Sequence, residues 1–147
     1  MFTRIVVGTD GSDTAAEAVR QAIDLAKMSG ATLSIVSAYA PVAKRRIQGE
    51  QAGAPPDIAY EIGPREDVNL VLDAAAAEAR AAGVEVQTHP VEADPADALL
   101  NVAEQIKADL IIVGNKGMTG TRRYFLGSVP NNVSHHAPCS VLIIQTT

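Results

Sequence analysis

The segment GNKGMTGTRRYFLGS, near the end of the sequence, contains four glycines and a serine, and three of the glycines and the serine stand at a notable spacing. They follow the spacing Gly114-x2-Gly117-x9-Gly127-Ser128, directly after the apolar run ADLIIVG. Glycine has no Cβ, so a bound group can approach the main chain closely at these positions. A helix that begins at Gly127 and Ser128 offers N–H groups and a dipole that favour an anion. The pattern therefore predicts a site for a phosphate or a ribose.

A second turn of small residues, GTDGS, follows the first apolar run and contains Gly8, Thr9 and Asp10. In a doubly wound sheet, ligands bind beyond the carboxyl ends of the strands where the winding direction reverses. We therefore expect the two turns to meet at that point. Basic side chains in the segment between the glycines add positive charge there: Lys116, Arg122 and Arg123.

Strands and helices alternate along the whole sequence. Short apolar or β-branched stretches predict strands at 4–10 (running into a turn), 32–39, 84–90, 108–114 and 140–146. Helical patterns cover 12–28, 64–82 and 94–107, and a short helix is expected after Ser128. Strands that are apolar throughout, joined by helices, indicate a parallel sheet with helices on both faces. We predict one doubly wound, Rossmann-like α/β domain over residues 1–147.

The helix ends have recognisable caps. The first helix begins at Ser12, or at a capping box formed by Thr14 and Glu17, and ends at Gly30. Asp94 caps another helix, whose first residue is Pro95.

Residues 41–63 interrupt the alternation with three prolines and three glycines. A loop of that length is either a lid or a solvated insert, and the sequence leaves both open. The basic cluster Lys44 to Arg46 lies in it, as a solvated face or as a phosphate clamp.

The composition argues against some classes of binding partner and indicates a cellular compartment. The net charge of −5 and the pI near 5.1 argue against duplex nucleic acid, which needs a basic face. Apolar runs stay below the roughly 18 residues that would span a bilayer, so no membrane insertion is expected. The single cysteine and the absence of a signal-peptide pattern at the start favour the cytoplasm.

The sequence resembles the universal stress protein family over essentially the whole chain. The resemblance lies in IVVGTDGS at the first strand, SAYAP after the second, and ADLIIVGNKG with FLGSVPNNVSHHAPCSVLII at the end. The spacing from Gly114 to Ser128 corresponds to the pattern of the members that bind ATP. The resemblance implies the strand order 3-2-1-4-5 and a homodimer through the last strand, residues 140–146, whose unpaired apolar edge invites a partner.

The resemblance also assigns roles. Asp10 would lie near the ribose and a metal-bound phosphate, the main chain around Ala38 would read the adenine edge, and Val113 would face the base. The glycines of the spacing and Ser128 would hold phosphates. The expected nucleotide-binding residues are Gly8, Thr9, Asp10, Ala38, Val113, Gly114, Lys116, Gly117, Gly127, Ser128 and Val129.

Pro130 lies in the first turn of the helix expected after Ser128 and supplies no backbone N–H. This helix start therefore has one donor fewer than a start without proline. We therefore expect ATP, with Mg²⁺ where it binds, to be held less tightly than in members with a donor there. AMP or cyclic AMP should compete well, and GSVPNNVS resembles members of actinobacterial type that bind cyclic AMP.

Enzymatic alternatives find little support. TDGSDT nearly matches the S-G-G-x-D-S loop of ATP pyrophosphatases, but the carboxylate of Asp10 would repel the pyrophosphate. The P-loop and dinucleotide motifs are absent. Slow ATP hydrolysis or self-phosphorylation stays open, with Thr119, Thr121 or Ser128 as acceptors, although these hydroxyls can equally cap turns. A dimeric scaffold that binds no nucleotide is the other alternative.

Histidine and cysteine do not form a convincing metal site. His135 and His136 are adjacent on a helix, so their side chains point ~100° apart. We expect Cys139 to be a small buried hydrophobe, and His89 to be a surface or turn residue at a strand end.

Overall fold

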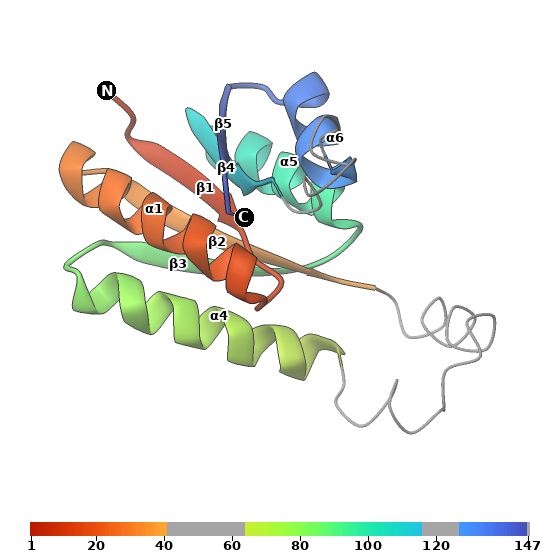
Figure 1. Cartoon of the computed structure of the whole chain (residues 1–147), viewed down its shortest axis with the longest axis horizontal. Coiled ribbons are helices and arrows are strands. Elements are labelled where there is room, and N and C mark those ends of the chain that lie inside the picture. Colours follow the sequence, from red (N-terminus) through yellow and green to blue (C-terminus); the bar gives the residue numbers. More distant parts are fainter. Residues whose placement is uncertain (41–63, 116–126, 147) are drawn as a thin grey trace.

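The computed structural model describes residues 1–40, 64–115 and 127–146. Strands and helices alternate as the sequence predicts (Figure 1). In chain order they are β1 (Arg4–Gly8), α1 (Asp13–Ser29), β2 (Thr32–Tyr39), α4 (Pro64–Ala81), β3 (Val86–Glu92), α5 (Pro95–Ile106), β4 (Leu110–Gly114), α6 (Ser128–His136) and β5 (Ser140–Ile144). The basic cluster at 44–46 and the expected loop 41–63 lie outside the described residues.

The five strands form one parallel sheet in the order β3-β2-β1-β4-β5. The middle of the central strand β1 is apolar and buried on both faces: Ile5, Val6 and Val7 are all 0% exposed. Val7 pairs with Ile35 of β2 on one side and with Ile112 of β4 on the other. The predicted fold class and strand order are confirmed.

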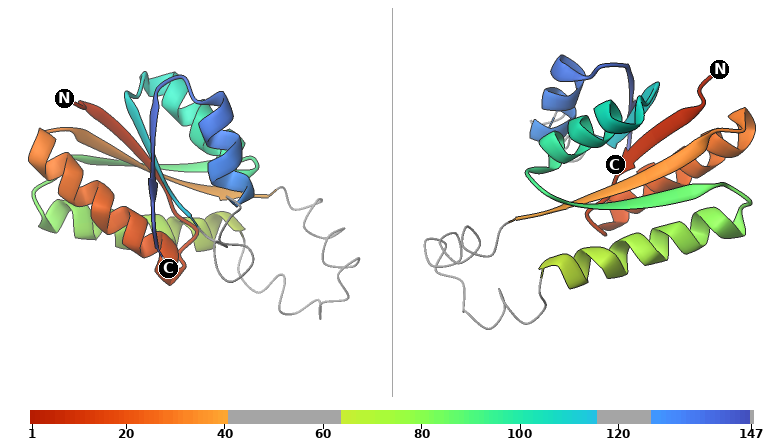
Figure 2. Two further views of the ribbon diagram at one scale, coloured as in Figure 1. Left: turned by 45° about the horizontal axis from the view of Figure 1, so that its top comes forward. Right: turned by 180° about the vertical axis from the view of Figure 1, so that it is seen from behind.

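Helices cover both faces of the sheet, α1 and α4 on one face and α5 and α6 on the other (Figure 2). Each face has its own hydrophobic cluster. Alternate strand residues divide between them, so that Ile5 and Val7 pack toward α1 while Val6 packs toward α5. The small residues Ala18, Ala22 and Ala26 on the buried stripe of α1 bring that helix close to the sheet.

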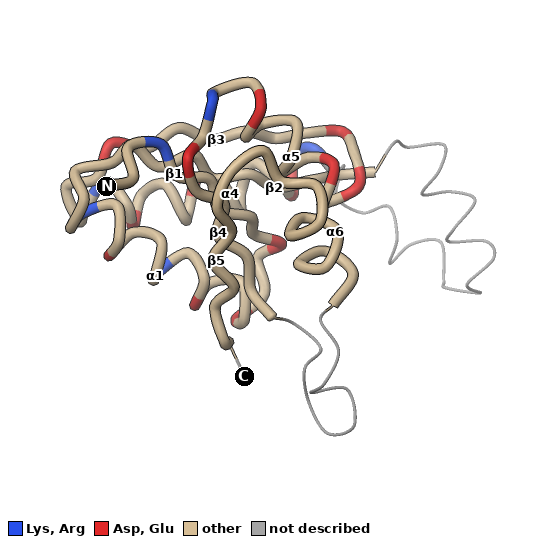
Figure 3. Tube along the Cα trace, turned by 90° about the horizontal axis from the view of Figure 1, so that it is seen from above, with Lys and Arg blue, Asp and Glu red and all other residues tan. Residues whose placement is uncertain are grey.

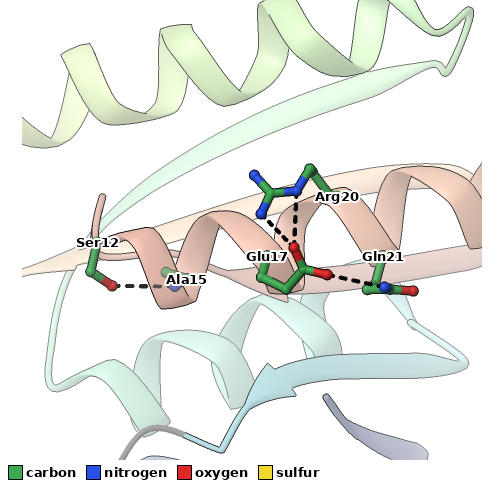
Figure 4. A network of polar contacts seen from close by, with 5 residues as sticks. All are labelled: Ser12, Ala15, Glu17, Arg20 and Gln21. Atoms are coloured by element: carbon green, nitrogen blue, oxygen red, sulfur yellow. Dashed lines mark hydrogen bonds and ion pairs between the residues drawn. The ribbon is translucent and has the colours of Figure 1, made fainter. Parts of the chain in front are cut away.

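The start of α1 settles one open choice. Ser12 is the N-cap, and its Oγ accepts a hydrogen bond from the Ala15 amide at 3.2 Å. Glu17 does not form a capping box; it accepts hydrogen bonds from Arg20 and Gln21 instead (Figure 4). The hydrogen bond from Arg20 lowers the pKa of the Glu17 carboxyl.

Strand β3 begins two residues later than the sequence predicts. Gly83 takes a φ of +81°, and the Val84 amide donates to the Ala79 carbonyl, so both residues serve the end of α4. The strand then continues through Pro90, which an edge strand tolerates. The prediction for His89 was wrong, because it lies within the strand and is half-buried.

Asp109, just before β4, is hydrogen-bonded to the start of β1. Its carboxylate accepts hydrogen bonds from the Thr3 amide at 2.8 Å, the Thr3 hydroxyl at 2.9 Å and the Arg4 amide at 3.1 Å. Desolvation raises the pKa of Asp109, but these hydrogen bonds together outweigh it and hold the pKa below its ordinary value. Because Asp109 serves this contact, β4 begins at Leu110 rather than at 108.

Charged residues of the described part are spread over several elements in the view of Figure 3, with acidic and basic positions intermixed. None of the helices in the described ranges combines the length and the apolar character needed to cross a bilayer.

Candidate functional site

The strand order reverses direction between β1 and β4. From β1 the chain moves outward to β2 and β3, and it then returns to add β4 and β5 on the other side. The connections that leave β1 and β4 therefore diverge at the carboxyl edge of the sheet, where α/β proteins bind ligands. Gly8 ends β1 and Gly114 ends β4, so both turns singled out in the sequence begin at this edge.

A cavity of about 390 Å³ lies at this edge, within the size range of small-molecule sites. Eight of the predicted residues line it: Gly8, Thr9, Asp10, Ala38, Val113, Gly114, Ser128 and Val129. Gly127 directly precedes α6 and is its N-cap. Lys116 and Gly117 lie outside the described residues, as do Arg122 and Arg123. The first turn and the described residues that flank the second thus line one cavity at the reversal point.

The lining of the cavity combines apolar and polar groups. The apolar side chains come from the four elements β2, α5, β4 and α6; they are Val36, Ala38, Leu99, Val113 and Val129. Hydroxyl and carboxylate groups are supplied by Asp10, Ser12, Thr14, Ser128 and Thr146. A ligand that fits this lining has a flat or apolar part joined to a polar part.

The loop after β1 is held by its own hydrogen bonds. The Thr9 amide donates to the Val36 carbonyl at 2.9 Å, which ties the loop to β2. The Gly11 amide donates to the Thr9 hydroxyl at 3.1 Å, and the Ser12 amide donates to Oδ1 of Asp10 at 2.9 Å. This Asx-turn fixes the Asp10 carboxylate at the cavity edge before any ligand binds.

The first turn of α6 supplies main-chain donors. The first amides of a helix have no carbonyl partner within it, and here they belong to Ser128 and Val129. Pro130 is buried, lines the same cavity and has no N–H. The next amide, that of Asn131, donates to the Gly127 carbonyl at 3.0 Å. The amides of Ser128 and Val129 thus have no carbonyl partner within the helix.

Two of the predicted glycines also serve packing within the protein. A Cβ at Gly8 would lie 3.1 Å from Cδ2 of Leu99, and a Cβ at Gly114 would lie 3.3 Å from Cγ2 of Thr146. Both distances are tighter than ordinary contacts. Neighbouring side chains therefore favour glycine at these two positions, whether or not a ligand binds there.

Sequence reasoning missed, among others, Leu99 and Thr146, which line the cavity, and Asn115, which contacts Thr146. Leu99 belongs to the helical stripe of α5 and reads as an ordinary core residue. Asn115 is 5% exposed, and its Oδ1 accepts hydrogen bonds from the Thr146 amide at 2.7 Å and the Thr146 hydroxyl at 3.0 Å. The two residues are 31 positions apart, and no local pattern connects them.

Metal ligands do not gather anywhere in the described ranges, where no group of three or more His, Cys, Asp or Glu side chains could hold an ion. His135 and His136 are exposed on α6. Cys139 is half-buried against the cluster under α5 and α6, and burial raises the pKa of its thiol. Its packing agrees with the expected role as a small hydrophobe, although part of it remains accessible.

The model of the universal stress protein family matches residues 1–145. The chain belongs to this family. A universal stress protein of Mycobacterium tuberculosis is 40% identical, with 99% of this chain and 98% of that protein covered. The strand order described above is thus that of a universal stress protein.

Solved structures of universal stress proteins have the same fold. One, a complex with cAMP, is 35% identical with a TM-score of 0.74, covering 99% of this chain and 98% of that one. Another, from Burkholderia pseudomallei, is 32% identical with a TM-score of 0.71, covering 97% of this chain and 95% of that one.

Proposed function

We propose that this universal stress protein binds an adenine nucleotide in the cavity between β1 and β4 and acts as a sensor or carrier of that nucleotide. The observation that carries the proposal is the pairing, in one cavity, of an apolar wall with the first turn of α6. The adenine would lie against Val113 and the main chain near Ala38, and Asp10 would accept a hydrogen bond from the ribose. The cAMP complex of a 35% identical relative supports the same ligand class.

The first turn of α6, where the phosphate would bind, favours a nucleotide with few phosphoryl groups. Ser128 and Val129 offer two main-chain donors, and Pro130 removes a third. Hydrogen bonds to a charged group contribute about 1.5–3 kcal/mol each. Together with burial of the adenine face, two of them are compatible with micromolar affinity, about 8 kcal/mol after the costs of association. We infer that cyclic AMP or AMP binds at least as well as ATP.

A metal ion could enter with ATP at Asp10, as the resemblance implies. The carboxylate lines the cavity, but its Oδ1 already accepts the Ser12 amide. A single carboxylate is a weak protein site for Mg²⁺, which would be bound mainly through the phosphates. The nucleotide therefore does not need the ion in order to bind.

Calorimetric titration of the purified protein with cyclic AMP, AMP, ADP and ATP, the last two with and without Mg²⁺, tests the proposal. We expect micromolar affinity for cyclic AMP or AMP. ATP that binds tenfold more tightly than every other nucleotide would overturn the preference for few phosphates. Failure of all four to bind would overturn the function itself.

We also propose a homodimer through β5. This strand is at the edge of the sheet, and its outer side is unpaired in the described part of the chain. Leu142 on it is 38% exposed. An exposed apolar edge strand is a template for pairing with another chain, and a second copy offers the same edge.

A further inference from the structure

Thr146 lies beyond the end of β5 and still forms part of the site. Thr146 lines the nucleotide cavity together with Gly114 and Ser128. It also borders a second hollow beside Asp13 and Thr14 at the start of α1. Figure 2 shows the chain running from β5 to this place, close to the start of α1. Thr146 thus borders both hollows, as Thr14 does.

Asn115 holds this segment by three hydrogen bonds. The Asn115 amide donates to the Ile144 carbonyl at 3.0 Å, which is the last contact of the β4–β5 ladder. Its side-chain Oδ1 then accepts both donors of Thr146, the amide at 2.7 Å and the hydroxyl at 3.0 Å. The side chain is almost fully buried, so water does not readily replace these bonds.

The consequence for the cavity follows from the contact between Thr146 and Gly114. The methyl group of Thr146 lies so close to Gly114 that a Cβ there would be 3.3 Å away. Thr146 therefore packs over the main chain at the end of β4, where both residues line the cavity. Within the described part of the chain, its amide and its hydroxyl both donate to Asn115.

We propose that Asn115 is a positioning residue, which fixes Thr146 as a wall of the nucleotide cavity. This inference rests on the proposed function and adds to it a residue that does not itself touch the cavity. An amide oxygen suits the task because it accepts two hydrogen bonds without placing a negative charge beside a phosphate site. Without the Asn115 side chain, the amide and the hydroxyl of Thr146 both lose their acceptor. The segment that carries Thr146 must then become ordered when the ligand binds, and this ordering weakens the binding.

A double-mutant cycle tests the proposal, using cyclic AMP as the probe in calorimetry. We expect Asn115→Ala and Thr146→Ala each to weaken binding about tenfold. The double variant should be no more than about twofold weaker than either single variant, because both remove the same wall. The matched control Asn101→Ala changes an exposed asparagine of α5 and should bind as the unmodified protein does.

Amide hydrogen exchange of the ligand-free protein gives a second readout that does not depend on the nucleotide. The Thr146 amide should exchange slowly in the unmodified protein and at least tenfold faster in Asn115→Ala. If Asn115→Ala fails to fold, Thr146→Ala still tests the wall, because that side chain lies beyond the last strand.

The outcomes separate the two claims. If the unmodified protein binds no adenine nucleotide, the proposed function fails and this inference fails with it. If it binds but Asn115→Ala stays within twofold, the inference alone is overturned. The inference is also overturned if the double variant loses as much affinity as the product of the two single losses. It is overturned likewise if the exchange rate of the Thr146 amide is the same in Asn115→Ala as in the unmodified protein.

Discussion

Gly11, in the loop at the cavity, lies directly against Val71 of α4: a Cβ at this glycine would be 2.8 Å from Cγ2 of that valine. The φ of Gly11 is +81°, in the left-handed region. The loop that presents Asp10 is therefore held from the α4 side as well as by its own hydrogen bonds.

Gly11→Ala should destabilise the protein more than Gly30→Ala. Both glycines have positive φ, which costs a residue with a Cβ about 1–2 kcal/mol, but a Cβ at Gly30 has nothing within 4 Å. At Gly11 the contact with Val71 adds overpacking of about 1–3 kcal/mol. Urea unfolding of the two variants measures the difference, and equal losses would show that α4 yields freely at this contact.

Asp109→Ala should lower the free energy of unfolding by about 1–3 kcal/mol at neutral pH, because it removes the acceptor for Thr3 and Arg4. The folded-state pKa of Asp109 is depressed, so its stabilisation is present above the unfolded pKa and is lost as the pH falls through the folded pKa. Unfolding measured from neutral to strongly acidic pH should therefore show a smaller acid loss in the variant. An identical pH profile would contradict the assigned role.

His89 should make the protein less stable in mild acid. Burial lowers the pKa of its imidazole, and its buried Nε2 has no hydrogen-bond partner among the described residues. As the pH falls, the imidazole of His89 is therefore protonated in the unfolded state before it is protonated in the folded state. The free energy of unfolding decreases as the pH drops below about 6.5. His89→Leu should flatten the stability profile between about pH 6.5 and 5, whereas His135→Leu, on an exposed face of α6, should keep the original slope. A profile unchanged by His89→Leu would exclude this group as the cause.

Leu142→Lys should convert the proposed homodimer to a monomer, because it places a charge on the outer edge of β5, where strand pairing would bring two copies together. Leu70→Lys is the matched control, since Leu70 is even more exposed, at 65%, but lies on α4. Sedimentation at micromolar concentration distinguishes the species. The interface is not at β5 if Leu70→Lys dissociates the dimer and Leu142→Lys does not.

The fold was predictable because its signals are local and agree with each other. The apolar strands β1 and β4 could only be buried on two faces, and Ser12, Gly30 and Asp94 mark helix ends, although Asp94 makes no side-chain cap hydrogen bond. The predicted element boundaries were wrong where contacts with other parts of the chain determine them. Val84 looks like a strand residue, but it completes the end of α4 instead.

The site was predictable to the extent that it uses turns and helix starts. Gly8, Asp10 and Ser128 follow from such signals and line the cavity. The contact between Asn115 and Thr146 does not, because it depends on two segments that become neighbours when β5 pairs with β4.

Titration of Gly127→Glu with cyclic AMP tests the central claim most directly. Gly127 has φ −60° and ψ 164°, a conformation open to any residue, so the variant should fold. Its side chain would bring bulk and negative charge to the first turn of α6, where we place the phosphate. The account predicts micromolar binding by the unmodified protein and at least tenfold weaker binding by the variant. A well-folded variant with unchanged affinity would contradict it.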